Sequence, residues 1–134
     1  MNDFDEQLRK LILRERHNFA GSSSRAIVEL VNLLLDFAIK IRASDMHIEP
    51  FDKALRVCYR VDGQLQEFHQ PLPLSLADAL TSRIKILARM DTTAAFLPLD
   101  GAIKFGNVEM RVASMPSFGA ESLTIRLLDS SLEL

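Results

Sequence analysis

Asp45, His47 and Glu49 are the side chains whose types and spacing come closest to a chemical site. They alternate along a short stretch expected to be a strand, so all three would project from one face. Carboxylate and imidazole groups are common ligands of divalent metal ions. Groups two residues apart on a strand are, however, about 6.5 to 7 Å apart, which is too wide for three of them to close on one ion. We therefore expect no metal site, and expect these side chains to bond neighbouring turns.

No motif for nucleophilic catalysis or for phosphate binding accompanies them. Cys58 lies between Arg56 and Arg60, which could lower its pKa, but no histidine stands in a nucleophile pattern with it, so packing is its expected role. A G-x-x-x-x-G-K-[ST] loop, which would wrap nucleotide phosphates in backbone N–H groups, does not occur in the sequence. We therefore expect that this chain alone is not an enzyme and holds no cofactor.

Length and charge exclude several other classes of protein. A chain of 134 residues suits one domain with one ordinary core. Sixteen basic residues against eighteen acidic ones create no uniform positive field, so nucleic acid is not an expected partner. The most apolar segment, 26–41, carries three charged side chains and is shorter than the roughly 20 residues that cross a bilayer. We expect no direct membrane insertion, and the single cysteine suits a reducing cytoplasmic setting.

Three helices are expected from the spacing of apolar residues. Apolar positions recur at i, i+3, i+4 and i+7 across 25–42 and again across 76–90, which is typical of helices that bury one face. The serines before the first of these can cap it, and Ser75 with Asp78 is a plausible cap for the second. Three basic residues are expected on the outer face of the second helix: Arg83, Lys85 and Arg89. Residues 3–18 have a narrower apolar stripe and would form a loosely docked leader, an arm that pairs with another subunit, or a helix that binds a specific partner.

Strands are expected where apolar and polar side chains alternate. Residues 55–61 alternate throughout and end at Asp62-Gly63, a pair that favours a tight hairpin turn because both central residues need positive φ. A short strand at 46–49 should precede them, with a break at Glu49-Pro50. Pro71 and Pro73 should then stop the sheet, since proline lacks the N–H that a ladder needs.

A second group of strands is expected in the last third of the chain. A second Asp-Gly pair, Asp100-Gly101, precedes an apolar run at 103–105, and Gly106-Asn107 turns the chain into the alternating residues 108–112. A last strand is expected at 121–128. The sequence therefore predicts an α+β fold, in which two main helices pack on a mixed or antiparallel sheet of about five to six strands, plus an N-terminal amphipathic helix.

Four stretches together resemble a known domain. They are SDMHIEP at 44–50, LRVCYRVDGQL at 55–65, LPLDG at 97–101 and ESLTIRLLD at 121–129. Their order and spacing are similar to those of the N-terminal domain that precedes the motor in type II secretion and type IV pilus assembly ATPases of the GspE/PilB type. The resemblance implies a PAS-like arrangement of helices and sheet. It divides the chain into an N-terminal helix and linker at 1–23, the domain at 24–129, and a tail at 130–134 that leads to a motor domain outside this sequence.

The resemblance also implies a function. Such a domain belongs to a hexameric ATPase, in which it couples the nucleotide state of the P-loop motor to the movement that drives protein secretion or pilus biogenesis. ATP and Mg²⁺ would be bound by the motor domain. The implied partners are the chain's own C-terminal P-loop domain, neighbouring subunits and the inner-membrane platform proteins of secretion or pilus systems. The implied location is cytoplasmic, peripheral to the inner membrane.

Two sets of residues match the family's motifs. The first set is expected to be structural: Asp45, His47, Glu49, Asp62, Gly63, Asp100 and Gly101. The second set is basic and is expected to assist the nucleotide, because a permanent cation can stabilise charge on a transferring phosphoryl group: Lys104, Arg111 and Arg126.

The sequence also departs from the family pattern near its third motif. The family commonly has basic residues where this chain has Ala95, Phe96 and Ala102, and glutamine where it has Leu99. These replacements favour an alternative function, a stand-alone, non-catalytic interaction module that has lost its coupling to a motor. We expect the chain to be a domain excised from a longer protein, the alternative being a free-standing relative. Secretion, pilus extension and DNA uptake are all compatible with this sequence.

Overall fold

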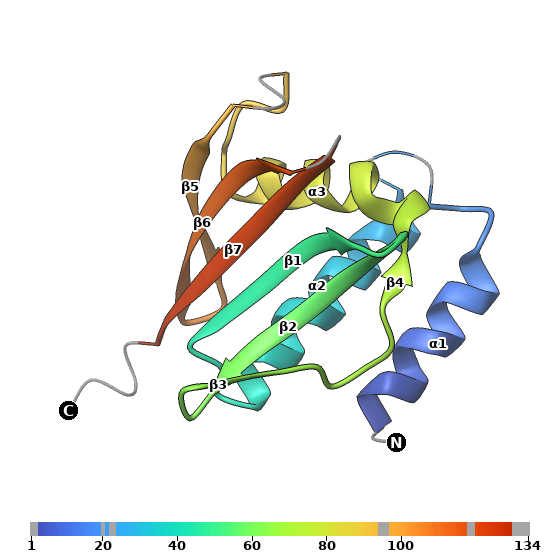
Figure 1. Cartoon of the computed structure of the whole chain (residues 1–134), viewed down its shortest axis with the longest axis horizontal. Helices are drawn as coiled ribbons and strands as arrows, with labels where there is room; N and C mark the ends of the chain where they lie inside the picture. Colours follow the sequence, from blue (N-terminus) through green and yellow to red (C-terminus); the bar gives the residue numbers. More distant parts are fainter. Residues whose placement is uncertain (1–2, 20, 22–23, 94–96, 118–119, 130–134) are drawn as a thin grey trace.

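The computed structural model describes residues 3–19, 21, 24–93, 97–117 and 120–129. An antiparallel sheet forms one layer, α2 and α3 cover one of its faces, and α1 lies beside α2 (Figure 1). The elements in chain order are α1 (Asp3–Glu15), α2 (Arg25–Lys40), β1 (Asp45–Phe51), β2 (Ala54–Val61), β3 (Gln64–Gln66), β4 (Leu72–Pro73), the short 3₁₀ helix η1 (Leu74–Leu76), α3 (Ala77–Leu87), β5 (Leu99–Phe105), β6 (Val108–Ser117) and β7 (Ala120–Asp129). No described helix is long and apolar enough to span a bilayer.

The predicted α+β class is confirmed, with a sheet of seven strands. The strand order is β3-β2-β1-β7-β6-β5, and β4 pairs with β2. The described pairings are all antiparallel, so the sheet is not mixed. This order places β7 next to β1, so the first and last motifs of the sequence lie side by side.

Alternation along the strands divides the sheet into an apolar face and a polar face. Met46 and Ile48 of β1 are buried, as are Leu123 and Ile125 of β7. These residues belong to the same core cluster as the buried residues of α2, which recur with helical spacing: Ala26, Ile27, Leu30, Val31, Leu34, Leu35 and Ala38. Ser24 caps α2 as predicted, because its side chain accepts a hydrogen bond from the N–H of Ile27 at 3.2 Å.

The turn that joins β1 to β2 was not predicted from the sequence. The predicted break at Glu49-Pro50 is wrong, since β1 continues to Phe51 and turns tightly through Asp52 and Lys53, whose φ angles are 49° and 66°. Pro50 is tolerated because the ladder between β1 and β7 ends at Ile48, so no partner strand needs the missing N–H on that side. The predicted Asp62-Gly63 turn is confirmed, with φ of 52° and 79°.

Gly101 does not form a turn. It lies inside β5 and has no positive φ, unlike Gly106, which turns the chain into β6 at φ 62°. A Cβ atom at Gly101 would come within 2.5 Å of the Ala88 carbonyl oxygen and 2.6 Å of Met90 Cγ. This second Asp-Gly pair therefore permits close packing of β5 on the end of α3.

Two predictions about α3 are wrong. The Ser75–Asp78 cap is absent, because η1 leads directly into α3 and the N-cap position, Leu76, makes no side-chain hydrogen bond. Lys85 is not on the outer face, since only 2% of its side chain is exposed. Its Nζ donates to both carboxylate oxygens of Glu121 at 2.6 and 2.9 Å. The pair joins α3 to the start of β7.

The sheet also continues past the prolines expected to stop it. Leu72 and Pro73 form β4, which pairs with Ala54 and Leu55 of β2. Together β3 and β4 cover the two ends of the outer edge of β2.

Helix α1 is docked on the rest of the chain. Phe4, Leu8 and Leu11 are buried, and the Phe4 ring stacks on Phe37 of α2 with a centroid distance of 3.8 Å. Asp5 adds a polar contact, because its Oδ1 accepts a hydrogen bond from the backbone N–H of Gln70 at 3.2 Å. The leader predicted from sequence is therefore not loose, whereas the domain boundary at residue 23 stays a prediction.

A buried histidine lies beside this helix. His69 Nδ1 donates to the Gln70 carbonyl oxygen at 2.8 Å, and Nε2 lies 3.0 Å from Tyr59 Oη, which fits acceptance of the tyrosine hydrogen by a neutral ring. Burial lowers the pKa of His69, although the Gln70 carbonyl and the charge of Asp5 act in the opposite direction.

Candidate functional site

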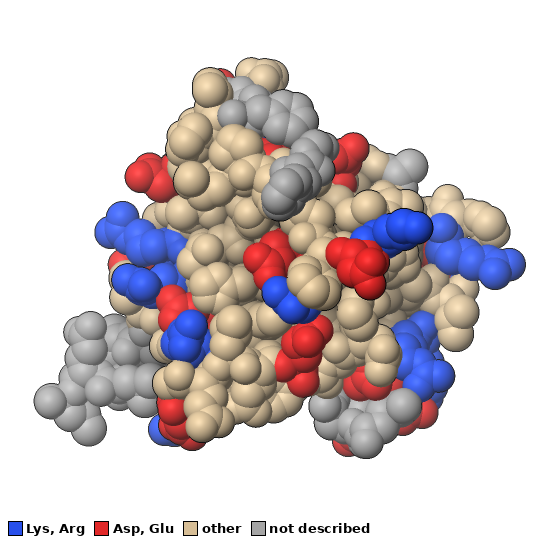
Figure 2. Space-filling model, viewed as in Figure 1, with Lys and Arg blue, Asp and Glu red and all other residues tan. Residues whose placement is uncertain are grey.

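The sheet face opposite α2 and α3 is called here the open face. Figure 2 shows this side of the molecule, where basic and acidic side chains lie directly against one another in several places. Strand register places four charged residues side by side across it: Arg111 of β6, Arg126 of β7, Asp45 of β1 and Arg60 of β2. These four residues form the charged row. Ala102 of β5 stands opposite Arg111 and ends it.

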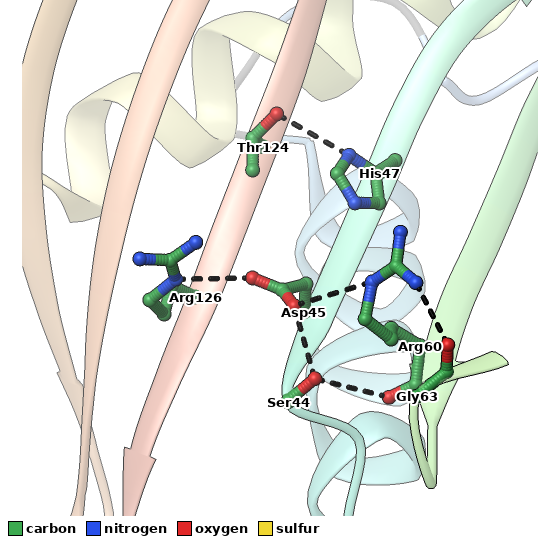
Figure 3. Close-up of polar contacts among 7 residues, drawn as sticks. All are labelled: Ser44, Asp45, His47, Arg60, Gly63, Thr124 and Arg126. Carbon is green, nitrogen blue, oxygen red and sulfur yellow. Dashed lines mark hydrogen bonds and ion pairs between the residues drawn. The ribbon is translucent and has the colours of Figure 1, made fainter. Parts of the chain in front are cut away.

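Asp45 holds the middle of the charged row (Figure 3). Its Oδ1 accepts a hydrogen bond from Arg126 Nε at 3.1 Å, and its Oδ2 accepts one from Ser44 Oγ at 2.9 Å. Arg60 Nε lies 3.7 Å from Oδ2. Burial would raise the pKa of Asp45, but the hydrogen bonds from Arg126 and Ser44 outweigh it and the pKa is lowered. The carboxylate is therefore ionised at neutral pH.

The hairpin turn fixes one end of the row. Arg60 Nη1 donates to the Gly63 carbonyl oxygen at 3.0 Å, so the turn that the sequence predicts also orients this guanidinium group. The backbone N–H of Ser44 donates to the Arg60 carbonyl oxygen at 2.8 Å. The N–H of Leu127 in turn donates to the Ser44 carbonyl oxygen at 3.0 Å. The start of β1 is thus bonded to both neighbouring strands.

Arg111 and Arg126 present their guanidinium groups to solvent at the other end of the row. Their side chains are 64% and 68% exposed. Arg126 is bonded to Asp45 through Nε, and Figure 3 shows its two Nη atoms turned away from Asp45. Arg111 Nη2 makes a long contact of 3.7 Å with Glu109 Oε1. Like charges directly opposite on neighbouring strands repel each other, so this arrangement favours an anionic partner.

A hollow lies beside these two arginines. Its volume is about 550 Å³; Ala102 and Ala113 give it a floor with little side-chain bulk, and Asp100 and Thr124 also line it. Arg111 and Arg126 also line it. The hollow therefore gives a small anionic group room to reach both guanidinium groups.

Lys104 lies on the open face but outside the charged row. It stands two residues beyond Ala102 on β5 and pairs in register with Glu109. It lines a separate hollow of about 820 Å³, together with Arg89 and Leu128. The structure thus brings Arg111 and Arg126 together and leaves Lys104 apart.

The three residues of the first motif each contact a neighbouring strand, and not the neighbouring turns that were expected. Asp45 binds Arg126, His47 Nδ1 lies 3.3 Å from Thr124 Oγ1, and Glu49 pairs with Arg56. Across the described residues, no three His, Cys, Asp or Glu side chains gather closely enough to hold a metal ion.

Cys58 lies opposite His47 in the register of β1 and β2. The residue is buried, which confirms the expected packing role. Burial raises the pKa of its thiol, and the charge of Arg56 lowers that pKa by less. The flanking arginines therefore do not activate the thiol.

The departures from the family pattern fall in two places. Ala95 and Phe96 lie outside the described residues. Leu99 is the half-buried first residue of β5, and Ala102 lies directly beside Arg111. A basic side chain at position 102 would have extended the charged row by one cation.

A family model described as "Type II/IV secretion system protein" matches residues 21–134. The chain belongs to this family. Type IV pilus assembly ATPase PilB of Myxococcus xanthus is 47% identical over 110 residues, which are 78% of this chain and 19% of the relative. Type II secretion system protein E of Xanthomonas campestris pv. campestris is 43% identical over 112 residues, 81% of this chain and 20% of the relative. The chain thus spans about one fifth of the length of these relatives of the type II/IV secretion family.

Two solved structures share the fold at low identity. The Legionella pneumophila ATPase DotB aligns with a TM-score of 0.59 and 18% identity, covering 78% of this chain and 31% of DotB. The pilus retraction motor PilT with bound ADP aligns with a TM-score of 0.54 and 17% identity, covering 74% of this chain and 29% of PilT.

Helix α1 precedes the residues that the secretion family model matches.

Proposed function

We propose that this chain is the accessory domain that precedes the P-loop motor of a secretion or pilus assembly ATPase. Its role is to couple the nucleotide state of that motor to movement. Membership of the type II/IV secretion family and the 47% identity to a pilus assembly ATPase support this assignment. The domain alone would neither hydrolyse ATP nor bind it tightly, because its sequence has no phosphate-binding loop.

The observation that carries the proposal is the pairing of Arg111 with Arg126. Two exposed guanidinium groups stand in register beside a hollow of about 550 Å³. A guanidinium group is always charged and offers several donors in a plane, which suits it to phosphate oxygens. Brought against a nucleotide held by a motor domain, the pair would stabilise the charge that spreads over the transferring phosphoryl group. Lys104, which lies apart from this pair, would contribute less.

The rest of the proposal concerns the parent assembly. ATP and Mg²⁺ would be held by the motor domain, and the open face would dock on that domain or on a neighbouring subunit of a hexamer. Inner-membrane platform proteins of the secretion or pilus system would be further partners. The parent complex would lie on the cytoplasmic side of the inner membrane.

Ala102 favours a second candidate function. It occupies the end of the charged row, where a basic side chain would have added a third cation next to Arg111. A domain with fewer cations for the nucleotide could instead be a non-catalytic interaction module that keeps the fold without the motor coupling.

A chimera tests the proposal. Residues 21–129 of this chain would replace the matching segment of Myxococcus xanthus PilB, and ATP hydrolysis and oligomer size would be measured. We expect a chimera that assembles and hydrolyses ATP. Arg111→Ala and Arg126→Ala should each lower kcat by roughly tenfold or more, because each removes a donor from the developing charge.

Matched variants separate the possible outcomes. Arg25→Ala removes an exposed arginine from the first turn of α2, away from the open face, and should leave kcat unchanged. An active chimera that tolerates Arg111→Ala and Arg126→Ala would show that these arginines do not assist the nucleotide. A folded chimera without ATP hydrolysis would favour the interaction module.

A further inference from the structure

Asp45 binds Arg126 through Nε, which leaves both Nη groups of the guanidinium available to a ligand. The bond runs from Nε to Oδ1 at 3.1 Å, and the two Nη atoms point away from the carboxylate (Figure 3). Paired N–H groups in a fixed fork are the geometry with which arginine binds two oxygens of a phosphate or carboxylate. Asp45 thus restricts the side chain without occupying that fork.

The carboxylate is itself held from two sides. Ser44 Oγ donates to Oδ2 at 2.9 Å, and Arg60 Nε lies 3.7 Å from the same oxygen. Arg60 is fixed in turn by the Gly63 carbonyl oxygen at 3.0 Å. The side chain of Asp45 is only 11% exposed, whereas that of Arg126 is 68% exposed. A rigid, buried carboxylate therefore anchors an exposed and otherwise mobile arginine.

We infer that Asp45 is a positioning residue, which orients Arg126 toward an anionic ligand in the hollow between β5, β6 and β7, with Ser44 and Arg60 keeping the carboxylate in place. The inference rests on the proposed role of Arg126. It goes beyond that role, because it assigns a task in anion recognition to the Ser44-Asp45 start of β1 and to the Asp62-Gly63 turn.

Two physical effects of Asp45 on anion binding have opposite signs. Its negative charge lies beside Arg126 and weakens the positive potential that attracts an anion. Its hydrogen bond reduces the side-chain entropy that Arg126 would lose when it binds a ligand. Removing the charge alone should strengthen anion binding, whereas removing a positioning residue should weaken it. The sign of the change in affinity therefore decides between the two.

The experiment uses the 134-residue chain and inorganic pyrophosphate as the probe. Binding is followed at low ionic strength by NMR of the arginine Nε–H groups, which reports Arg111 and Arg126 separately. Asp45→Asn removes the charge and leaves a single acceptor oxygen, so the side chain can no longer accept from Arg126 on one side and face Ser44 and Arg60 as an acceptor on the other. Glu49→Gln is the matched control, since it removes one negative charge from the same face of β1 at a residue that pairs with Arg56 and not with the row.

We expect the Asp45→Asn chain to bind pyrophosphate several-fold more weakly than the Glu49→Gln chain, and Ser44→Ala to cause a smaller loss. Asp45→Glu, which keeps a carboxylate, should recover part of the affinity. Without pyrophosphate, the Arg126 Nε signal of the natural chain should shift with pH below the usual aspartate range, because the pKa of Asp45 is lowered, and should lose this shift in Asp45→Asn.

Other outcomes would overturn the inference in distinguishable ways. Binding by Asp45→Asn that equals or exceeds that of Glu49→Gln would show that the carboxylate acts only by its charge, and the proposed role of Arg126 would survive. Pyrophosphate that moves neither the Arg111 nor the Arg126 signal in the natural chain would remove the anion site itself. Backbone spectra of each variant establish that it is folded, and Ser44→Ala and Asp45→Glu keep the test decisive should Asp45→Asn unfold.

Discussion

Gly63 and Gly101 have different physical requirements for the absence of a side chain. Gly63 has a φ of 79° and open space around its Cα, so its constraint is conformational. Gly101 has an ordinary φ, but a Cβ there would meet the Ala88 carbonyl oxygen at 2.5 Å. Because that oxygen belongs to the backbone, it cannot move without shifting the end of α3.

Asparagine substitutions should separate these two requirements. Gly63→Asn should cost less than about 1 kcal/mol, since asparagine tolerates the left-handed conformation, whereas Gly63→Val should cost more than about 1 kcal/mol. Gly101→Ala should cost about 2 kcal/mol because it overpacks the α3–β5 contact, and Gly101→Asn should be no better. Urea unfolding of the four variants measures these costs. Equal losses for Gly63→Asn and Gly101→Asn would contradict the distinction.

Cys58 provides a second prediction for a single residue. Its thiol is buried and its pKa is raised by that burial, so little thiolate is present at neutral pH. Folded protein should react with a thiol reagent such as DTNB at a rate limited by opening of the structure, and urea-unfolded protein should react at once. Rapid labelling of the folded chain would show that the neighbouring arginines outweigh burial.

The ion pair between Lys85 and Glu121 shows why contacts between elements cannot be predicted from local sequence patterns. Lys85 follows Ile84 in α3, so the helical pattern alone suggested that a charged residue there would face solvent. Its long side chain instead reaches the start of β7, a strand more than thirty residues later. Only the placement of β7 beside this helix makes the partner apparent.

Removing one member of this pair should destabilise the domain strongly. Lys85→Met leaves the Glu121 carboxylate, 12% exposed, without its cation and should cost about 3 kcal/mol. The double variant Lys85→Met with Glu121→Leu should recover much of that loss, since no unpaired charge remains. A double-mutant cycle from urea unfolding measures the coupling. Additive losses would show that the two residues act independently.

At the scale of the whole molecule, local patterns predicted most elements but not their neighbours. The helical spacing was sufficient to predict α2. The alternation that ends at the Asp62-Gly63 turn was sufficient to predict β2 and the turn that follows it. A turn at Asp52-Lys53 would also have predicted the Asp45–Arg60 pairing, by counting outward from its two central residues. The neighbouring position of β1 and β7, which brings Arg126 to Asp45, depends on the order of the strands and has no local signal. The charged row is therefore a property of the sheet, although the resemblance had singled out several of its members.

The dependence of overall stability on pH combines two groups from different parts of the fold. Burial lowers the pKa of His69 below its ordinary value of 6.5, so the unfolded chain binds a proton at that residue more readily than the folded chain does. The contribution of His69 to the free energy of unfolding should be fully present above pH 6.5, and it should be lost as the pH falls from there toward the pKa of the folded state. The pKa of Asp45 is also lowered, from 3.8, so a second loss should begin near that pH and continue toward its folded pKa.

Variants assign each loss to its residue. His69→Gln can still donate to the Gln70 carbonyl oxygen and accept from Tyr59, but it does not titrate, so its free energy of unfolding should vary less with pH between about 7 and 5. Asp45→Asn should instead flatten only the more acidic window. Urea unfolding across this range measures both slopes. If the natural chain and His69→Gln lost stability equally between about pH 7 and 5, the neutral histidine beneath α1 would not be the source of the first loss.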